Sequence, residues 1–474
     1  MAEWGNNSSR IRMYCMLVEL SVQHRDPDGQ PPHQENRSQE ARTARALERE
    51  VEASEPARDA EPSDRAFAFC DSDPIELTEH ERNYGFYVLG KTGSGKTVAL
   101  SNAALLDIAV GKAVIFFDPH GDAARAIMAS IPSHRTEKVC YLDLSHMNSL
   151  AWNPLSDVPP HRAALAAINL TDALKDIWPE TWGERLASFL RNGFHLLIEH
   201  GNATMRDLPR LYYDKEHRER FTARIKDPEL NHFWNGEFRS YDDRQRREAQ
   251  GPILNRIGQF LAIPEIRSVV SHVRSTLKLR TAIDKNYIII VNLSKGTTGG
   301  TPSSIFGSLL ASSIKTALMS REDTDEHLRA PLAFFADEFH NFGTIAWAEM
   351  LSECRKYGLQ LVLAHQFTQQ LDADVLAAVL GNVDTLMVFR VGHADAKLLA
   401  PALETGDLLY DRDRLAYVQP EGIPPSKLMN QSRFQACLRR GTDHFFVETA
   451  PPFPSLKRYE DNLASSNRRF APKV

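Results

Sequence analysis

The sequence contains one segment whose residue types and spacing suit the binding of a nucleoside triphosphate. Residues 90–97 read Gly-Lys-Thr-Gly-Ser-Gly-Lys-Thr and match the full pattern GxxxxGK followed by Ser or Thr. Glycines let backbone N–H groups approach a phosphate, and the helix that follows adds its N-terminus. We expect Lys96 to contact the β- and γ-phosphates of ATP and Thr97 to ligate Mg²⁺. The residues expected to surround the phosphates are Gly90, Thr92, Gly93, Ser94 and Gly95.

A glycine-rich turn without a ligand is the alternative for a bare match to this pattern. Here the apolar run Tyr87–Leu89 precedes the loop, and a helical pattern over Thr97–Val110 follows it. This strand–loop–helix order is the context that the motif requires. It favours a phosphate-binding loop over a simple turn.

Two acids follow a second apolar run, in the sequence Leu-Ala-Phe-Phe-Ala-Asp-Glu that begins at Leu332. We expect Asp337 to hold the Mg²⁺ shell through water, and Glu338 to orient and deprotonate the attacking water as general base. The plainer alternative is an ordinary loop that happens to begin with two acids.

Four further polar residues lie where a phosphoryl-transfer site would need them. Gln366 follows the strand-like run 359–363 and could sense the γ-phosphate. Asp118 follows the run 113–117, at the same predicted sheet edge, although a Pro-Gly turn explains it equally well. Arginine stabilises charge that develops on the γ-phosphate, often from a neighbouring subunit. The two candidates are Arg355 and Arg390, and a surface ion pair is the plainer reading of each.

The elements that must position these residues form an alternating pattern of short apolar runs and longer helical segments. Continuous apolar strands separated by helices are typical of a parallel sheet covered on both faces. The predicted fold class is therefore α/β, a P-loop NTPase of the RecA-like kind. The predicted strands are 86–89, 113–117, 139–142, 287–291, 332–335, 359–363 and 386–389.

The middle of the chain interrupts that alternation with helical periodicity and indicates an inserted all-α subdomain over 161–285. Residues 205–285 hold 17 Lys and Arg against 12 Asp and Glu, a local net charge of +5. Phosphate contacts from such residues would give DNA binding that is salt-sensitive and independent of sequence. A solvated helix face is the alternative. The basic clusters are Arg244, Arg246 and Arg247, and Arg274, Lys278 and Arg280.

The remaining segments complete the predicted organisation. Residues 1–66 are expected to be a disordered linker, because 23–66 has almost no large apolar side chains and a net charge of −4. The ATPase domain would comprise 67–160 and 286–450 on either side of the insertion. Its last part, 434–449, is predicted to form a hairpin that turns at Gly441, and 451–474 would be a tail.

Composition limits the classes of protein that the chain can belong to. The chain has 474 residues and a net charge of −6, which excludes a uniformly basic nucleic-acid binder. Its five cysteines include no CxxC pair, which argues against a disulfide framework or zinc site and fits a reducing cytoplasm. No apolar stretch is long enough to cross a membrane. We expect a cytoplasmic protein, either free or peripheral at the inner face of the membrane.

Taken in order, these motifs resemble the HerA/FtsK superfamily of ring-forming DNA motors. The similarity is greatest to type IV secretion conjugative coupling proteins of the TraD/TraG kind, over about residues 75–450. Besides the phosphate loop it rests on FFDPHGD (116–122), DEFHNF (337–342), ECRKYGLQLVLAHQ (353–366) and GNVDTLMVFRVGHADA (381–396). In the insertion, the segments around Asn231–Trp234 and Leu254–Arg256 also look like this family.

The resemblance implies a homohexameric ATPase that moves DNA through a central channel, with the insertion facing DNA or a relaxase partner of the secretion system. It assigns γ-phosphate sensing to Gln366 and favours Arg355 as the arginine finger. Such proteins usually begin with membrane-spanning helices, which this chain lacks, so membrane anchoring is not expected. The chain has His340, Cys354 and Asp384 where relatives more often have Gln, Ala and Gly, and we assign no chemistry to these three.

Three functions remain open from the sequence. The first is an ATP-driven DNA translocase that serves conjugation or mobile-element transfer. The second is an ATPase of the same fold that energises protein secretion or a DNA-processing or defence complex. The third is an ATP-gated scaffold, against which the two intact acids Asp337 and Glu338 argue.

Overall fold

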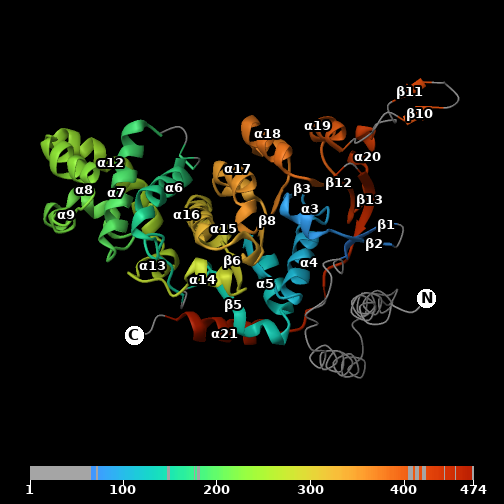
Figure 1. The fold of residues 1–474 in the computed structure, drawn as a ribbon, viewed down its shortest axis with the longest axis horizontal. Coiled ribbons are helices and arrows are strands. Elements are labelled where there is room, and N and C mark those ends of the chain that lie inside the picture. The colour runs from blue at the N-terminus through green and yellow to red at the C-terminus, as the bar shows by residue number, and fades with distance from the viewer. Residues whose placement is uncertain are drawn as a thin grey trace.

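The computed structural model describes residues 66–471, apart from 71–72, 147–149, 176, 179–181, 404–408, 412–415, 419–422, 442 and 454. The predicted N-terminal linker therefore lies outside the described residues, except for Ala66. A central sheet separates two helical layers, and a group of helices extends from one end of the molecule (Figure 1). No helix in the described ranges is both long and apolar enough to cross a membrane.

The sheet of the described chain has 11 strands in the order β2-β1-β13-β12-β9-β3-β8-β7-β4-β6-β5. From β9 to β5 every neighbouring pair is parallel. This confirms the predicted α/β class and the predicted strands, because strands buried on both faces read as continuous apolar runs. The parallel strands are β3 (Phe86–Leu89), β4 (Ala113–Asp118), β5 (Val139–Asp143), β6 (Ile288–Asn292), β7 (Leu332–Ala336), β8 (Leu359–His365) and β9 (Thr385–Phe389).

Four antiparallel strands extend the sheet beyond β9. The predicted hairpin is present, with β12 (Gln435–Arg440) paired to β13 (Asp443–Thr449) and Arg440 opposite Asp443 across the turn at Gly441. Two short strands, β1 (Ala66–Cys70) and β2 (Asp73–Glu76), add to the outer side of β13. A separate two-stranded sheet pairs β10 (Leu409–Asp411) with β11 (Ala416–Val418).

Helices cover both faces of the sheet, because successive residues of each strand point to opposite faces. On β4, Phe116 belongs to one apolar core and Phe117 to the other. The first core is closed by α4 (Lys96–Ala109) and α5 (Asp122–Ser130). The helices packed in the second core include α16 (Gly300–Met319), α17 (Thr344–Glu353), α18 (Ala373–Asn382) and α19 (His393–Leu403).

Every element described between β5 and β6 is helical. Its core is aromatic, with Phe189, Tyr212, Trp234 and Phe238 all buried and in ring contact. The family-like segment around Trp234 forms a π-helix, His232–Glu237, so its aromatic residues serve this core. The principal helices are α6 (Ala163–Lys175), α7 (Glu184–His200), α8 (Asp207–Tyr213), α9 (Lys215–Thr222), α10 (Pro228–Asn231), α11 (Phe238–Ser240), α12 (Asp243–Ala262), α13 (Pro264–Val270) and α14 (Leu279–Asp284).

The C-terminal segment differs from the tail that the sequence suggested. Residues Tyr459–Phe470 form helix α21, which packs beside α5 and β5 (Figure 1). Buried Asn462 donates to Met128 O at 2.8 Å, and Ser466 Oγ accepts the Tyr141 N–H at 2.8 Å. The apolar residues of this segment are few, so its periodicity gave little signal. Polar contacts with the sheet layer hold it together with the packing of Tyr459, Leu463 and Phe470 against the two cores.

Short elements connect these layers. The α-helices are α3 (Glu79–Asn83), α15 (Lys295–Thr298) and α20 (Pro425–Met429). The 3₁₀ turns are η1 (Ser133–Lys138), η2 (Pro160–Arg162), η5 (Ser320–Asp323), η6 (Glu326–Leu328), η7 (Phe339–Asn341), η8 (Arg355–Tyr357) and η9 (Thr368–Gln370).

Candidate nucleotide-binding site

The phosphate-loop motif lies between the end of β3 and the start of α4, as predicted. Gly93 has φ +77° and Gly95 has φ +117°, values that favour glycine. A Cβ atom at Gly93 would meet nothing, whereas at Gly95 it would lie 2.8 Å from the Phe434 ring. Gly95 is therefore required twice, by its backbone angle and by the close approach of Phe434.

Backbone hydrogen bonds from neighbouring strands hold this loop. The Lys91 N–H donates to Arg390 O at 2.9 Å, and the Gly90 N–H donates to His365 O at 3.3 Å. The Phe434 N–H donates to Ser94 O at 2.8 Å. The ends of β8 and β9 and the start of β12 therefore fix the loop from both sides, and this part of the cradle is preformed.

The predicted lysine and the two predicted acids come together at the carboxyl edge of the sheet. Lys96 Nζ lies 2.7 Å from Glu338 Oε1 and 3.4 Å from Asp337 Oδ1. Thr97 Oγ1 donates to Asp337 Oδ2 at 2.7 Å. Lys96, Asp337 and Glu338 are all at most 5% exposed. Residues from α4 and from the end of β7, far apart in the sequence, thus form one buried charged cluster.

Burial and charge act in opposite directions on Lys96. Burial lowers the pKa of its ammonium, but the carboxylates of Asp337 and Glu338 outweigh that effect and the net pKa is raised. Lys96 therefore stays charged. Glu338 has a left-handed backbone with φ +48°, which is unusual for a side-chain-bearing residue and turns it toward this cluster.

Asp118 lies at the adjacent strand end, but its carboxylate is already engaged. It accepts the backbone N–H groups of His120 at 2.8 Å and Ala124 at 2.9 Å, and so caps the start of α5. Burial raises its pKa, with a further contribution from Asp337, while the backbone donors oppose the rise. This geometry favours the capping interpretation over a direct contact with the nucleotide.

Gln366 lines a cavity of about 500 Å³ above the phosphate loop. Lys91 and Thr92 form one wall, and residues that follow β9, including Asp395, form another. Asp395 accepts from the backbone and hydroxyl of Thr368, which joins α19 to the turn after Gln366. Gln366 therefore stands beside the loop, as its position after β8 predicted.

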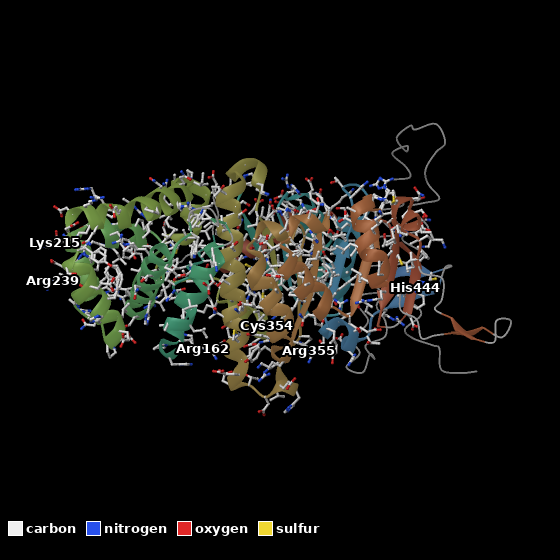
Figure 2. All side chains as sticks on the ribbon, turned by 90° about the horizontal axis from the view of Figure 1, so that it is seen from above. Arg162, Lys215, Arg239, Cys354, Arg355 and His444 are labelled. Carbon is white, nitrogen blue, oxygen red and sulfur yellow. The ribbon has the colours of Figure 1, made fainter. Side chains whose placement is uncertain are left out.

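The two candidate arginines lie at opposite edges of the sheet. Arg390 follows β9 beside the loop, and its carbonyl holds Lys91, while its side chain is exposed. Arg355 precedes β8 and stacks its guanidinium over Tyr84, 4.2 Å from the ring centroid. Figure 2 shows Arg355 at the side of the molecule, away from the inserted helices that carry Lys215 and Arg239. Arg355 cannot reach the phosphate loop of its own chain.

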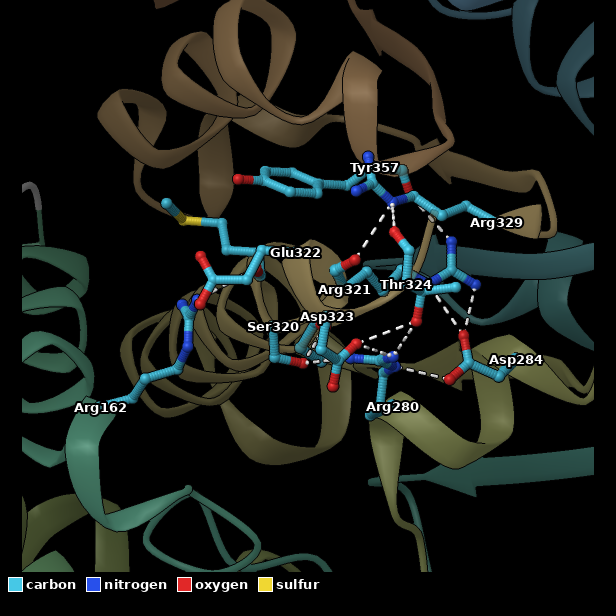
Figure 3. A network of polar contacts seen from close by, with 12 residues as sticks. Arg162, Arg280, Asp284, Ser320, Arg321, Glu322, Asp323, Thr324, Arg329 and Tyr357 are labelled. Carbon is cyan, nitrogen blue, oxygen red and sulfur yellow. Dashed lines mark hydrogen bonds and ion pairs between the residues drawn. The ribbon is translucent and has the colours of Figure 1, made fainter. Parts of the chain in front are cut away.

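The basic clusters of the insertion are largely neutralised within the chain. Arg244 pairs with Glu248 at 3.0 Å, and Lys278 faces Asp157 at 3.6 Å. Arg280 belongs to a polar network with Asp284 and Asp323 (Figure 3). Among the described contacts, Arg247 and Arg274 have no ion pair, and both are exposed. Of the acids in these pairs, Asp157 and Asp323 lie outside 205–285, so they reduce the positive field of the insertion below the net charge of +5 counted for that segment.

Sequence reasoning missed two residues of this site. Lys295, from α15, donates to Asn341 Oδ1 at 2.6 Å, and Asn341 in turn donates to Glu338 O at 2.7 Å. Burial lowers the pKa of Lys295, and Glu338 opposes the change. Phe434 was the other omission. Neither Lys295 nor Phe434 belongs to a recognisable motif. Each lies at the site only because its neighbouring strand is placed there in the sheet.

The residues present fit a magnesium–nucleotide complex. A hydroxyl (Thr97) and a carboxylate (Asp337) already meet, and oxygen donors of this kind suit Mg²⁺. Ser94 Oγ in the loop is buried and has no hydrogen-bond partner among the described residues. Together with the charged Lys96, this is the donor set that polyphosphate binding requires.

Comparison with known proteins agrees with this geometry. Residues 74–438 match the family model of the type IV secretion-system coupling protein DNA-binding domain. No curated protein sequence matches the chain. Three solved structures are similar over most of their length. The bacterial conjugative coupling protein TrwB, unbound, has a TM-score of 0.59 at 15% identity, covering 88% of this chain and 92% of that chain.

The other two structures extend the comparison. TrwB with a non-hydrolysable ATP analogue has a TM-score of 0.59 at 18% identity, covering 87% of this chain and 93% of that chain. VirB4 of Thermoanaerobacter pseudethanolicus has a TM-score of 0.55 at 13% identity, covering 83% and 97%. At such identities these likenesses show the fold, whereas the family model matches most of the sequence itself. The chain belongs to the family of type IV secretion-system coupling protein DNA-binding domains.

Proposed function

We propose that this protein is an ATP-driven DNA translocase that hydrolyses ATP with Mg²⁺ during conjugative or mobile-element DNA transfer by a type IV secretion system. The observation that carries the proposal is the buried cluster of Lys96, Asp337 and Glu338, together with the half-buried Thr97, beneath a preformed phosphate loop. Membership of a DNA-binding coupling-protein family supports the choice of DNA as the substrate that is moved. TrwB, whose fold is similar, has been solved with ADP and Mg²⁺.

The proposed chemistry follows from what each side chain can do. Lys96 would exchange its two carboxylate partners for the β- and γ-phosphates of ATP. Thr97 and Asp337 would hold Mg²⁺, which neutralises phosphate charge when bound. Glu338, released from Lys96, would accept a proton from the attacking water. Gln366 would contact the γ-phosphate or that water from the other side of the cavity.

The assembly that we propose is a homohexamer. Because Arg355 lies at the sheet edge opposite its own phosphate loop, it can serve as an arginine finger only for a neighbouring subunit. Arg390, beside the loop, is the alternative within the same chain. Either residue would stabilise charge on the γ-phosphate.

DNA contact is proposed for the helical insertion, 161–285, between the two parts of the ATPase domain, 67–160 and 286–450. Arg247 and Arg274 are the first residues to test, because they are exposed and lack an ion pair among the described contacts. A relaxase or a secretion-system component is the proposed protein partner. We place the protein in the cytoplasm, where it would work at the inner face of the membrane.

The ATPase rate with and without single- and double-stranded DNA tests the proposal. We expect DNA to stimulate turnover in the wild-type chain and Lys96→Ala to abolish it, because the ammonium that binds the phosphates is lost. Arg247→Gln, at a proposed DNA contact, should retain basal turnover and lose part of the stimulation by DNA. Turnover that is indifferent to DNA would favour a role in protein secretion or a processing complex. An assembled wild-type protein without turnover would favour the ATP-gated scaffold.

A further inference from the structure

A continuous chain of polar side chains runs beneath the carboxyl edge of the sheet and ends at Glu338. The Tyr87 hydroxyl contacts His365 Nε2, and His365 Nδ1 lies 3.2 Å from Gln370 Oε1. Gln370 Nε2 lies 3.1 Å from His340 Nε2, and His340 Nδ1 lies 3.5 Å from Glu338 Oε2. Only Glu338 of these five has a proposed role so far.

Backbone donors fix the orientation of the Gln370 amide. One end of that amide accepts the N–H groups of Gln366 and Phe367, each at 3.0 Å. A backbone N–H can only donate, so this end is the oxygen. The other end, which faces His340, is therefore the NH₂ group and can only donate.

The amide in turn fixes the tautomers of both histidines. Since Gln370 donates to His340 Nε2, that nitrogen accepts, and the ring proton of neutral His340 lies on Nδ1, facing Glu338. At His365, Nδ1 faces the amide oxygen and so donates, which leaves Nε2 to accept from Tyr87. Burial lowers the pKa of His340 to about 4 and that of His365 to about 3, which keeps both rings neutral near pH 7. Tyr87 therefore donates to His365, and His365 donates to Gln370 Oε1. On the other side, Gln370 donates to His340, whose Nδ1–H faces Glu338.

The two oxygens of Glu338 have different neighbours. Oε1 binds Lys96 at 2.7 Å. Oε2 lies 3.5 Å from His340 Nδ1, and neither of these two buried atoms has a hydrogen-bond partner among the described residues. If Lys96 turns to a phosphate, as the proposed function requires, Glu338 loses the first partner. The His340 contact then remains to orient the carboxylate.

We propose that Gln370 and His340 are positioning residues that hold Glu338 for water activation and link its orientation to the Gln366 turn. The inference rests on the proposed ATP hydrolysis. A single amide, Gln370, joins the two sides of the γ-phosphate position, because its oxygen holds the backbone of Gln366 and its nitrogen holds the histidine that faces Glu338. This assigns a role to His340, to which the sequence analysis gave none.

Steady-state kinetics and nucleotide binding test the proposal together. In Gln370→Ala and His340→Ala we expect kcat to fall about tenfold or more, because an unoriented base transfers its proton poorly. The affinity for a fluorescent ATP analogue should stay near the wild-type value, since neither residue lies in the phosphate loop. Asp374→Ala, exposed on neighbouring α18, is the control and should retain full turnover.

His340→Gln separates positioning from simple packing. A glutamine there can accept from Gln370 through its oxygen and donate to Glu338 through its nitrogen, so most of the turnover lost in His340→Ala should return. The proposal is overturned if Gln370→Ala turns over like the wild type. It is equally overturned if nucleotide affinity falls in parallel with kcat, or if His340→Gln is no better than His340→Ala.

A second measurement does not depend on turnover. In ¹⁵N-histidine-labelled protein, the ring signals that disappear in His340→Gln belong to His340 and should show the Nδ1–H tautomer. An Nε2–H tautomer would contradict the chain of donors. If the wild-type protein proves unable to hydrolyse ATP, the proposed function fails, while the tautomer still decides whether this chain exists.

Discussion

The two edges of the parallel sheet both bury charge, but they hold it in different ways. At the carboxyl edge, Lys96 is paired with Asp337 and Glu338, side chain to side chain. At the amino edge, the fully buried Arg321 binds Asp284 and also donates to the carbonyls of Ala330 and Tyr357, each at 2.8 Å (Figure 3). The first cluster is held by side chains and the second by the backbone.

This difference separates a binding site from a structural support. We call the amino-edge cluster, in which Arg321 binds Asp284 and the carbonyls of Ala330 and Tyr357, the brace. Side-chain partners can be exchanged for a phosphate at little cost in structure, because the backbone of the cluster is held independently by β3 and β7. Arg321 cannot leave its carbonyls without exposing them unpaired, which is expensive in the interior. Arg329 reinforces the same turn by donating to Lys356 O. The brace also fixes the backbone of the turn that carries Arg355.

The largest effect that we expect lies at the carboxyl edge. Glu338→Gln removes the proposed base but keeps the shape of the side chain, so kcat should fall about 100-fold or more. The midpoint of thermal unfolding should change little, since Asp337 remains as a partner for Lys96. Calorimetry beside the ATPase assay checks both. A large loss of stability with modest loss of turnover would show that this cluster, too, is structural.

The opposite result is expected at the amino edge. Arg321→Met leaves the buried Tyr357 carbonyl and the half-buried Ala330 carbonyl without this donor. It also takes from Asp284 one of its two arginine partners, so the free energy of unfolding should fall by about 3 kcal/mol. Nucleotide affinity should be unaffected at a temperature where the variant is folded. Denaturant titration measures the loss, with the exposed Arg247→Met as the matched control. If Arg321→Met were as stable as that control, the distinction between brace and site would fail.

Asp118 lies at the nucleotide site, but like Arg321 its side chain is bound to backbone groups. Asp118→Asn has one acceptor oxygen for two backbone N–H groups, so we expect about 1 kcal/mol of lost stability. Affinity for a fluorescent ATP analogue should stay as in the wild type, because the carboxylate is used in capping α5. A clear fall in affinity without a stability change would instead restore the nucleotide-binding role predicted from sequence.

The last prediction concerns the pH dependence of stability. Since the folded pKa of His365 is about 3 and an unfolded histidine titrates near 6.5, the unfolded state binds more protons between these values. Stability should therefore fall as the pH drops below about 6.5, by about 1.4 kcal/mol per pH unit from this one group. His365→Gln should show a shallower pH dependence than the wild type between pH 6 and 4. Equal slopes would mean that His365 stays exposed enough to protonate in the folded state.

Much of the fold was predictable because its strands are buried on both faces. Runs such as Ala113–Phe117 and Leu332–Phe335 are apolar throughout, and each lies within a strand of the structure. The sequence pattern predicted helices and strands less well where tertiary contacts, and not a periodic apolar face, stabilise the element. Strand β1 depends on pairing with β13, and β2 on pairing with β1. Helix α21 depends on polar contacts with α5 and β5 and on a few apolar contacts, including that of Phe470.

The sequence by itself determined the phosphate loop, the strand-end acids and the positions of the parallel strands along the chain, because local spacing and continuous hydrophobicity carry that information. Only the tertiary structure decided which charges are partners. In the sequence, Arg280 and Asp118 look the same as charged residues that are free to bind a ligand. In the structure, Arg280 is paired with Asp284, and Asp118 accepts a backbone N–H at the start of α5. The Gln370 amide reaches Glu338 through His340 only because β7 and β8 are neighbours. Such contacts join residues far apart in the chain, and no local pattern records them.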